Sequence, residues 1–218
     1  MSLNTMSDAR EILQFWFHQT PPERWFRSDA GFDEQIRHRF SDVHQAALRG
    51  ELAEWRESSS GRLAEIIVLD QFSRNLFRNS PLSFAADGMA LALAQELVKQ
   101  PDFDQLPVER RDFALLPFMH SESPIIHAAA LRLYQRYAST RSLRAETEHK
   151  RVIDQFGRYH YSGYNYRELV SDHCHRLGIQ LHNYLLLQEI ESRVDNWWYK
   201  KIIRTQTTSI NIYSKYAS

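Results

Sequence analysis

The stretch Gly61–Arg78 restricts the folds open to this chain more than any other part of the sequence. It reads GRLAEIIVLDQFSRNLFR, which begins apolar and ends crowded with polar side chains. At about 100° per residue, one helical stripe contains Leu63, Ile67, Asp70, Arg74 and Arg78. A helix that is apolar on most faces belongs in a protein interior. We therefore expect the charges on its second half to face partners or a cavity rather than open water.

Charge and cysteine content exclude several classes of protein. The 218 residues contain 27 Lys and Arg and 27 Asp and Glu, so no overall field attracts nucleic acid or an anionic membrane. The single cysteine, Cys174, excludes an internal disulfide framework and fits a reducing compartment, which predicts a cytoplasmic protein. No apolar run is long enough to span a bilayer, and the N-terminus does not resemble a secretion signal.

Helix signals follow one another through the first three quarters of the chain, and β-branched alternation is nearly absent. A capping box at Asp8 and Glu11 predicts the first helix, and Gly50 is placed to end the second. We expect further helices over residues 61–78, 81–98, 107–118, 124–137 and 143–156. Ser58-Ser59-Ser60-Gly61 is expected to be a linker, and Pro117 to kink or end its helix. The prediction is an all-α fold of antiparallel helix pairs stacked as a solenoid.

The composition changes after Arg158. Eight of the ten tyrosines lie beyond it, whereas all twelve phenylalanines and all seven prolines lie before it. We therefore expect a helical domain over residues 1–158 and a divergent segment over 159–204 that packs on it. Helical spacing within that segment predicts helices over 166–181 and 187–197, and residues 205–218 are expected to form a loose tail.

Five ordered motifs resemble one bacterial family, called domain of unknown function 924. They are ILQFWF, WFRSDAGFDEQIRHRF, GRLAEIIVLDQFSRNLFR, LPFMHSE and HKRVIDQFGR, and the resemblance covers about residues 9–158. The resemblance implies an all-helical fold similar to tetratricopeptide-repeat proteins, which would make the stacked helix pairs a right-handed α-solenoid. It implies no established reaction.

The same resemblance marks a set of polar positions. The motif LDQFxRNxFR places the first five, FAxD the sixth, MHSE the next three, and HKRVIDQFGR the last two. They are Asp70, Gln71, Arg74, Asn75, Arg78, Asp87, His120, Ser121, Glu122, His149 and Arg158. Family members typically continue from FGR with an aromatic residue and Pro-His-Arg-Asn, but this chain has Tyr159-His160-Tyr161-Ser162. We hypothesise a divergent or frame-altered end, and translation of the coding DNA in the other two frames tests the second version.

Asp70 and Arg74 have the i,i+4 spacing at which a carboxylate and a guanidinium pair on one helix face. One interpretation is a structural ion pair between neighbouring helices. Another is that Arg74 and Arg78 project into a cavity and hold an anion, because two arginines with one acid leave a positive surplus on that face. Gln71 and Asn75 are placed to orient either partner.

His120, Ser121 and Glu122 follow the expected helix end at Pro117. His120 paired with Glu122 or Asp70 is a candidate general base, and a hydrogen-bonded structural histidine is the alternative. A metal site of His120, Glu122, His149 and Asp154 matches no dedicated ligand spacing, and no G-x-S-x-G elbow surrounds Ser121. We therefore expect neither a metal nor another cofactor.

Three functions remain open from the sequence. The first is binding of a small anionic ligand or an acidic peptide end through Arg74 and Arg78, with Asp70, His120 and Glu122 shaping the pocket. The second is a hydrolase-type enzyme that uses His120 or Glu122 as general base. The third is a protein-interaction scaffold. We expect no nucleic-acid or membrane partner, and the sequence does not determine the oligomeric state.

Overall fold

The structure is a computed structural model that describes residues 8–159. Every regular element in that part of the chain is a helix, which confirms the all-α prediction. The α-helices are α1 (Ala9–Gln14), α2 (Ala30–Leu48), α3 (Ser59–Ile67), α4 (Ser73–Leu76), α5 (Asp87–Leu97), α6 (Val108–Met119), α7 (Pro124–Tyr137) and α8 (Thr140–Phe156). None of these helices is long and apolar enough to cross a lipid bilayer.

The central helix is formed by α3, a π-helical turn at Val68–Phe72, and α4, which follow one another without a break over residues 59–76. Residues 63–73 are all buried, with the apolar and polar side chains alike shielded from water. The central helix packs against α1, α2, α5 and α6. The chain is thus built around the stretch that the sequence singles out.

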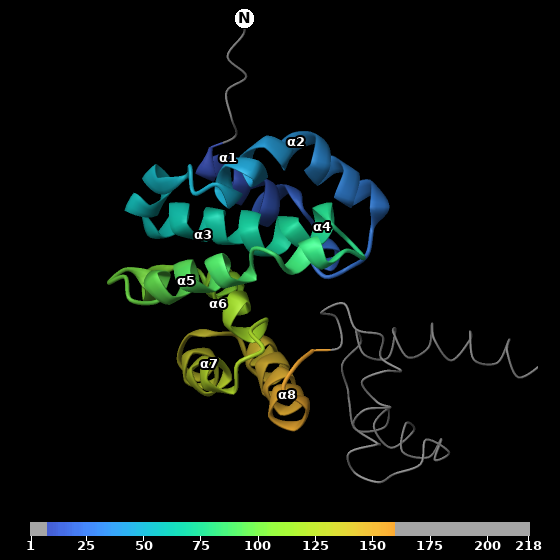
Figure 1. Cartoon of the computed structure of the whole chain (residues 1–218). Coiled ribbons are helices and arrows are strands. Elements are labelled where there is room, and N and C mark those ends of the chain that lie inside the picture. The colour runs from blue at the N-terminus through green and yellow to red at the C-terminus, as the bar shows by residue number, and fades with distance from the viewer. Residues whose placement is uncertain (1–7, 160–218) are drawn as a thin grey trace, which may run out of the picture. The chain divides into compact units, whose positions relative to one another are not determined.

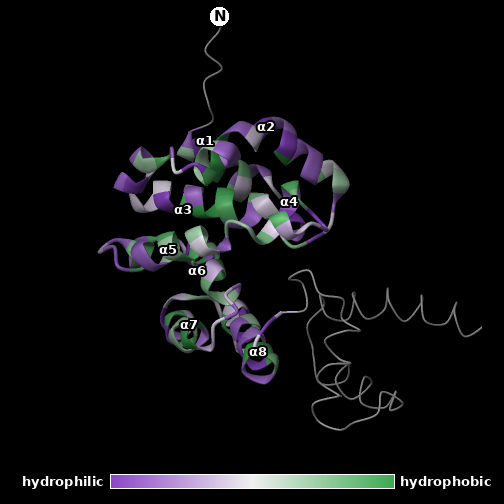
Figure 2. Cartoon of the chain, viewed as in Figure 1, coloured by the Kyte–Doolittle hydropathy of each residue, from purple (hydrophilic) through white to green (hydrophobic). Residues whose placement is uncertain are grey.

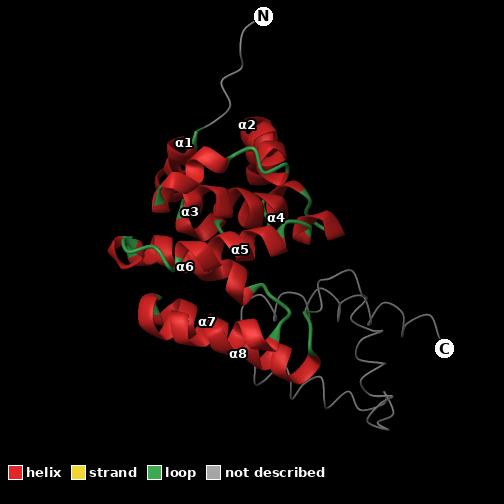
Figure 3. Cartoon of the chain, turned by 60° about the vertical axis from the view of Figure 1, so that its left-hand side comes forward, coloured by secondary structure: helices red, strands yellow, loops and turns green. Residues whose placement is uncertain are grey.

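The helices lie in successive layers. Figures 1 and 3 show α1 and α2 on one side of α3 and α4, with α5 and α6 on the other side. The α7 and α8 pair follows, packed through α7 against α6. This order places the C-terminal end of α6 beside the second half of the central helix.

An aromatic cluster fills the space between α2 and the central helix. Phe15 packs against Phe40 with ring centroids 4.8 Å apart, and Phe40 stacks on Phe72 at 5.1 Å. Trp16 is fully buried and meets Phe113 of α6 edge-on at 5.6 Å. In Figure 2 the outer side of α2 is mostly hydrophilic and the middle of α3 is hydrophobic. Burial of this apolar surface drives formation of the layers.

Several of the predicted helix ends are confirmed. The Asp8 carboxylate accepts a hydrogen bond from Glu11 N at 2.9 Å, as an N-cap does. Ser123 caps α7 in the same way. Gly50 and Gly157 follow α2 and α8 with φ of 73°, the left-handed conformation that glycine adopts without a steric penalty.

Some expected boundaries are wrong. Ser58 caps the central helix, so Ser59 and Ser60 are helical rather than part of a linker. The helix expected over 81–98 is divided into a 3₁₀ turn at Pro81–Phe84 and α5. Of the two effects expected of Pro117, the end of the helix is wrong, because α6 continues to Met119, and the kink stays a prediction. The helices expected over 166–181 and 187–197 and the tail at 205–218 lie outside the described residues.

Candidate functional site

Asp70 lies in the π-helical turn of the central helix and is 1% exposed. Its Oδ2 accepts a hydrogen bond from Gln71 Nε2 at 2.5 Å, and its Oδ1 lies 3.0 Å from Arg74 Nη1. The predicted i,i+4 ion pair with Arg74 is therefore confirmed. A buried carboxylate needs such donors, because a charge taken out of water is costly unless it is paired and hydrogen-bonded.

Arg74 joins Asp70 to Asp87 at the start of α5. Its Nη1 and Nη2 donate to the two Asp87 carboxylate oxygens at 3.0 and 2.9 Å, and Nη1 also donates to the Asp70 carbonyl at 2.7 Å. The guanidinium carbon lies 5.5 Å from the centre of the Phe84 ring. The Arg74 side chain keeps 23% of its surface exposed, so the forked pair with Asp87 is partly open to solvent.

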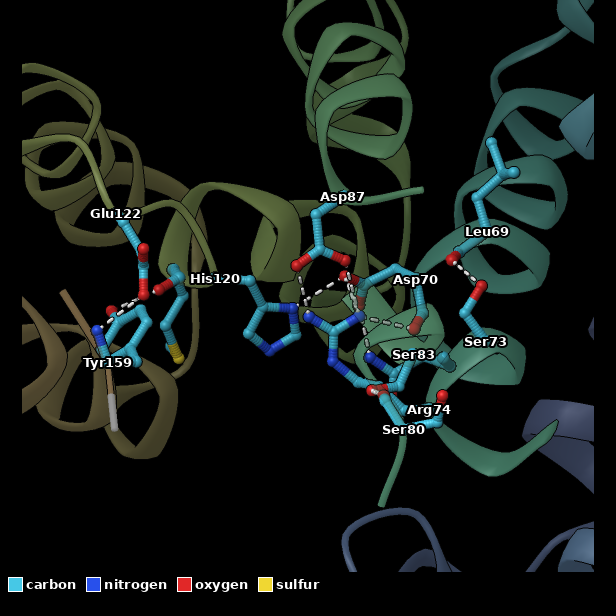
Figure 4. Close-up of polar contacts among 12 residues, drawn as sticks. Leu69, Asp70, Ser73, Arg74, Ser80, Ser83, Asp87, His120, Glu122 and Tyr159 are labelled. Atoms are coloured by element: carbon cyan, nitrogen blue, oxygen red, sulfur yellow. Dashed lines mark hydrogen bonds and ion pairs between the residues drawn. The ribbon is translucent and has the colours of Figure 1, made fainter. Parts of the chain in front are cut away.

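His120 brings a third helix to the same carboxylate. It follows the last residue of α6, and its Nδ1 lies 2.7 Å from Asp70 Oδ1. Figure 4 shows the imidazole turned toward Asp70, Arg74 and Asp87, whereas Glu122 points to Tyr159. The His120 side chain is 20% exposed, and its Nε2 makes no hydrogen bond within residues 8–159.

The charge on Asp70 fixes the tautomer of this histidine. Burial raises the pKa of the Asp70 carboxyl, but the charges of Arg74 and His120 and the hydrogen bonds from His120 and Gln71 outweigh it and bring the pKa to about 2. Asp70 is therefore ionised at neutral pH and only accepts hydrogen bonds. His120 Nδ1 must therefore carry a proton in this contact, and whenever the ring is neutral its lone pair is on Nε2.

Arg78 belongs to a neighbouring ion pair. Its Nε and Nη2 donate to Asp33 Oδ2 and Oδ1 at 2.6 and 2.7 Å, and Asn75 Nδ2 donates to Asp33 Oδ1 at 2.7 Å. Asp33, from the first turn of α2, was not predicted as a site residue. The positive surplus inferred from sequence is wrong, because Asp33, Asp70 and Asp87 face the two arginines.

The other predicted site residues are held elsewhere. Glu122 Oε1 accepts a hydrogen bond from Tyr159 N at 2.7 Å, and Ser121 Oγ accepts one from Ser123 N at 3.2 Å. His149 Nδ1 lies 2.8 Å from the Ala145 carbonyl, and burial lowers its pKa to about 4. Arg158 lies half-buried just after α8.

The contacts of His120 identify its carboxylate partner. Of the two partners considered from sequence, Asp70 is the one hydrogen-bonded to His120. Within residues 8–159, no group of three or more His, Cys, Asp or Glu side chains is arranged to hold a metal ion.

Sequence reasoning also missed two buried residues, His127 of α7, whose Nε2 lies 2.8 Å from the Ser121 carbonyl, and Glu146 of α8. Their side chains are fully buried and lie 2.7 Å apart between His127 Nδ1 and Glu146 Oε1. The 19-residue separation of this pair and the 45-residue separation of Asp33 from Arg78 match no local spacing rule. Helical periodicity indicates which face of a helix is buried, but it does not identify partners on other helices.

Comparison with known proteins places the chain among uncharacterised relatives. A family profile described as "Bacterial protein of unknown function (DUF924)" matches residues 12–162. The chain is also similar to a solved structure of a protein of unknown function from Agrobacterium tumefaciens. The two are 36% identical, the match covers 69% of this chain and 85% of that one, and the TM-score is 0.65. No curated protein matches.

Proposed function

The chain belongs to the bacterial DUF924 family, and from this premise we propose that His120 is the general base of a hydrolase-type site. One observation carries the proposal. His120 Nδ1 is bonded to the buried, ionised Asp70, while Nε2 has no partner among residues 8–159 and the ring is partly exposed. The carboxylate fixes the tautomer of the histidine and leaves its second nitrogen accessible. A histidine that takes a proton from one group and returns it to another requires this arrangement.

The proposed chemistry is activation of water. His120 Nε2 takes a proton from a water molecule as its oxygen attacks an electrophilic carbon or phosphorus of the substrate. The Asp70 carboxylate stabilises the imidazolium that forms, and the ring then returns the proton to the leaving group. Arg74 Nη1 lies 3.0 Å from Asp70 Oδ1, so the role of Arg74 in this scheme is to keep the carboxylate ionised and in place.

Turnover with a panel of carboxylic esters, amides and phosphate esters tests the proposal. We expect one class to be hydrolysed, with kcat lowered about 10²–10⁴-fold in His120→Gln. The melting temperature should change little, because glutamine retains an amide donor and Gln71 and Arg74 still hold the Asp70 carboxylate. His38→Gln removes an exposed histidine from α2 and is the matched control. A His120→Gln protein with wild-type turnover refutes the general-base role.

A second test needs no substrate. Diethyl pyrocarbonate acylates neutral imidazole nitrogens, and peptide mass spectrometry reports the rate at each histidine. We expect His120 to react at Nε2, with a rate relative to exposed His38 that falls in Asp70→Asn, since the carboxylate supports the basicity of the ring. Equal relative rates in both proteins would contradict the proposed role of Asp70.

Binding of a small carboxylate or an acidic peptide end at Arg74 is the second candidate function. It is favoured by the Arg74 fork, which already holds the Asp87 carboxylate in bidentate geometry at a partly exposed position. Burial raises the pKa of Asp87 even with Arg74 beside it. A ligand carboxylate would replace Asp87 on the same two nitrogens.

Thermal shift with acetate, succinate and phosphate separates this candidate from the first. Asp87→Asn should increase the stabilisation that a carboxylate gives, because the competing charge is gone, and Arg74→Gln should abolish it. If wild type, Asp87→Asn and Arg74→Gln respond identically to every anion, the exchange at Arg74 does not occur.

We further propose that the helix layers form a tetratricopeptide-like right-handed solenoid and that the protein works in the cytoplasm. The order of packing in the second half supports the solenoid, since α5 packs on α6, α6 on α7 and α7 on α8. The single cysteine supports a reducing compartment.

A further inference from the structure

The turn that carries His120 is held from outside by side chains of other segments. It joins α6 to α7 and contains His120, Ser121, Glu122 and the capping Ser123. Two amide groups of the turn donate back to α6: His120 N to the Leu116 carbonyl at 2.9 Å, and Ser121 N to the Phe118 carbonyl at 3.3 Å. These bonds close the end of α6, but they leave the carbonyls on either side of His120 for other donors.

Both of those carbonyls are bound. The Tyr159 hydroxyl, from the segment after α8, donates to the Met119 carbonyl at 2.6 Å. His127 Nε2, from α7, lies 2.8 Å from the Ser121 carbonyl. Tyr159 N also donates to Glu122 Oε1 at 2.7 Å. The backbone immediately before and immediately after His120 is therefore fixed by two side chains that belong to neither α6 nor the central helix.

The proton positions in this group follow from the acceptors. A carbonyl only accepts, so His127 Nε2 carries a hydrogen directed at Ser121, and the Tyr159 hydroxyl hydrogen goes to Met119. His127 Nδ1 shares a proton with Glu146 Oε1 at 2.7 Å, and the pair is neutral overall whichever atom holds it. The Tyr159 hydroxyl oxygen lies 3.0 Å from His127 Nε2, which joins the two positioning side chains to each other.

A polar pair buried this deeply is weak evidence for added stability. Both side chains are 0% exposed, and well-packed apolar residues in place of a buried ion pair are often as stable or more so. Its specific effect here is geometric, because His127 Nε2 lies 2.8 Å from the Ser121 carbonyl, immediately after His120. The contact between His120 Nδ1 and Asp70 Oδ1 spans two helix layers, and a misplacement of about 1 Å is enough to impair catalytic geometry.

We propose that Tyr159 and His127 are positioning residues that hold the His120 ring on Asp70 by binding the carbonyls of Met119 and Ser121. The inference rests on the proposed function for its purpose, but the positioning itself is measurable without any substrate.

The experiment is ¹⁵N NMR of histidine-labelled protein, which distinguishes the Nδ1–H from the Nε2–H tautomer. The His120 signals are assigned by their absence in His120→Gln. Wild type should show His120 as the Nδ1–H tautomer. Tyr159→Phe keeps the ring and removes the hydroxyl, and we expect the Nε2–H tautomer, which free histidine prefers, to appear at His120. Tyr137→Phe, in α7, is the matched control and should leave the His120 signals unchanged.

A second variant removes the hydrogen bond to the Ser121 carbonyl without leaving a buried charge. His127→Leu with Glu146→Met replaces the pair by apolar side chains and should also release the His120 tautomer. If His120 keeps its wild-type chemical shifts in both variants, the positioning proposal is wrong. A wild-type protein whose His120 is not the Nδ1–H tautomer instead overturns the proposed general-base function, so the two failures are distinguishable.

Discussion

His44 of α2 provides a pH-dependent test of how the central helix is packed. The ring is 1% exposed and its Nε2 lies 2.8 Å from Ser73 Oγ. Ser73 itself donates to the Leu69 carbonyl at 2.6 Å, so His44 Nε2 must be the donor in the first contact. Nδ1 then holds the lone pair, and it is buried without a partner within the described residues. Burial lowers the pKa of His44 to about 4.

The sign and size of the effect follow from that pKa. An unfolded histidine titrates near 6.5, so between pH 6.5 and 4 the unfolded chain binds a proton that folded His44 does not. His44 therefore contributes stability that is present above pH 6.5 and is lost as the pH falls toward 4. When the titration is complete, the lowered pKa corresponds to a loss of about 3 kcal/mol in the free energy of unfolding. About 2 kcal/mol of this is lost by pH 5.

Urea unfolding of wild type and His44→Gln at pH 7, 6 and 5 measures this contribution. Glutamine retains an amide donor for Ser73 and does not titrate. The variant should be less stable at pH 7, and the difference from wild type should shrink by about 2 kcal/mol at pH 5. His149, whose pKa burial also lowers to about 4, acts equally in both proteins and cancels. His38→Gln should lose stability in parallel with wild type. Parallel curves for His44→Gln as well would refute the reasoning.

Two further predictions concern Gly61 in the central helix and the ion pair that Arg78 makes just after this helix. In thermal unfolding, Gly61→Ala should destabilise the protein by about 1–3 kcal/mol, because an added Cβ would lie 1.9 Å from the Trp55 carbonyl oxygen. The control, Gly88→Ala, adds a Cβ that meets nothing within 4 Å, and it should stabilise the protein by up to about 1 kcal/mol. Arg78→Lys should lower the free energy of unfolding by about 1–3 kcal/mol, since lysine cannot form both hydrogen bonds to Asp33. In a double-mutant cycle with Asp33→Asn, most of that loss should appear as coupling energy. A coupling energy near zero would mean that the pair is only a surface contact.

The sequence predicted local features well because their causes are local. The N-cap at Asp8 and the positive φ of Gly50 depend on a few neighbouring residues, and both are confirmed. Burial of residues 63–73 was also foreseeable from the apolar faces of the Gly61–Arg78 stretch. The error at Pro81, where one helix was expected and a 3₁₀ turn intervenes, concerns a boundary that side-chain periodicity does not define.

The partners of the site residues were harder to predict, because they depend on how separate helices pack. The Asp70–Arg74 pair lies within one helix and was predicted from its spacing. Asp33 reaches Arg78 from α2, so counting acids on one stripe gave the wrong charge balance. His120 had two candidate carboxylates in the sequence, and only the packing of α6 against the central helix selects Asp70.

The π-helical turn at Val68–Phe72 determines where the central helix tolerates a change in length. A π turn closes its hydrogen bond over five residues instead of four, and thus accommodates one more residue than a regular turn. Deletion of one residue there would restore regular winding and leave the downstream residues on the same faces of the helix. Deletion of one residue from α3 would instead rotate everything downstream by about 100°, and Arg74 would then turn away from Asp87. Across relatives, differences of one residue in the length of the central helix should therefore occur at the π turn.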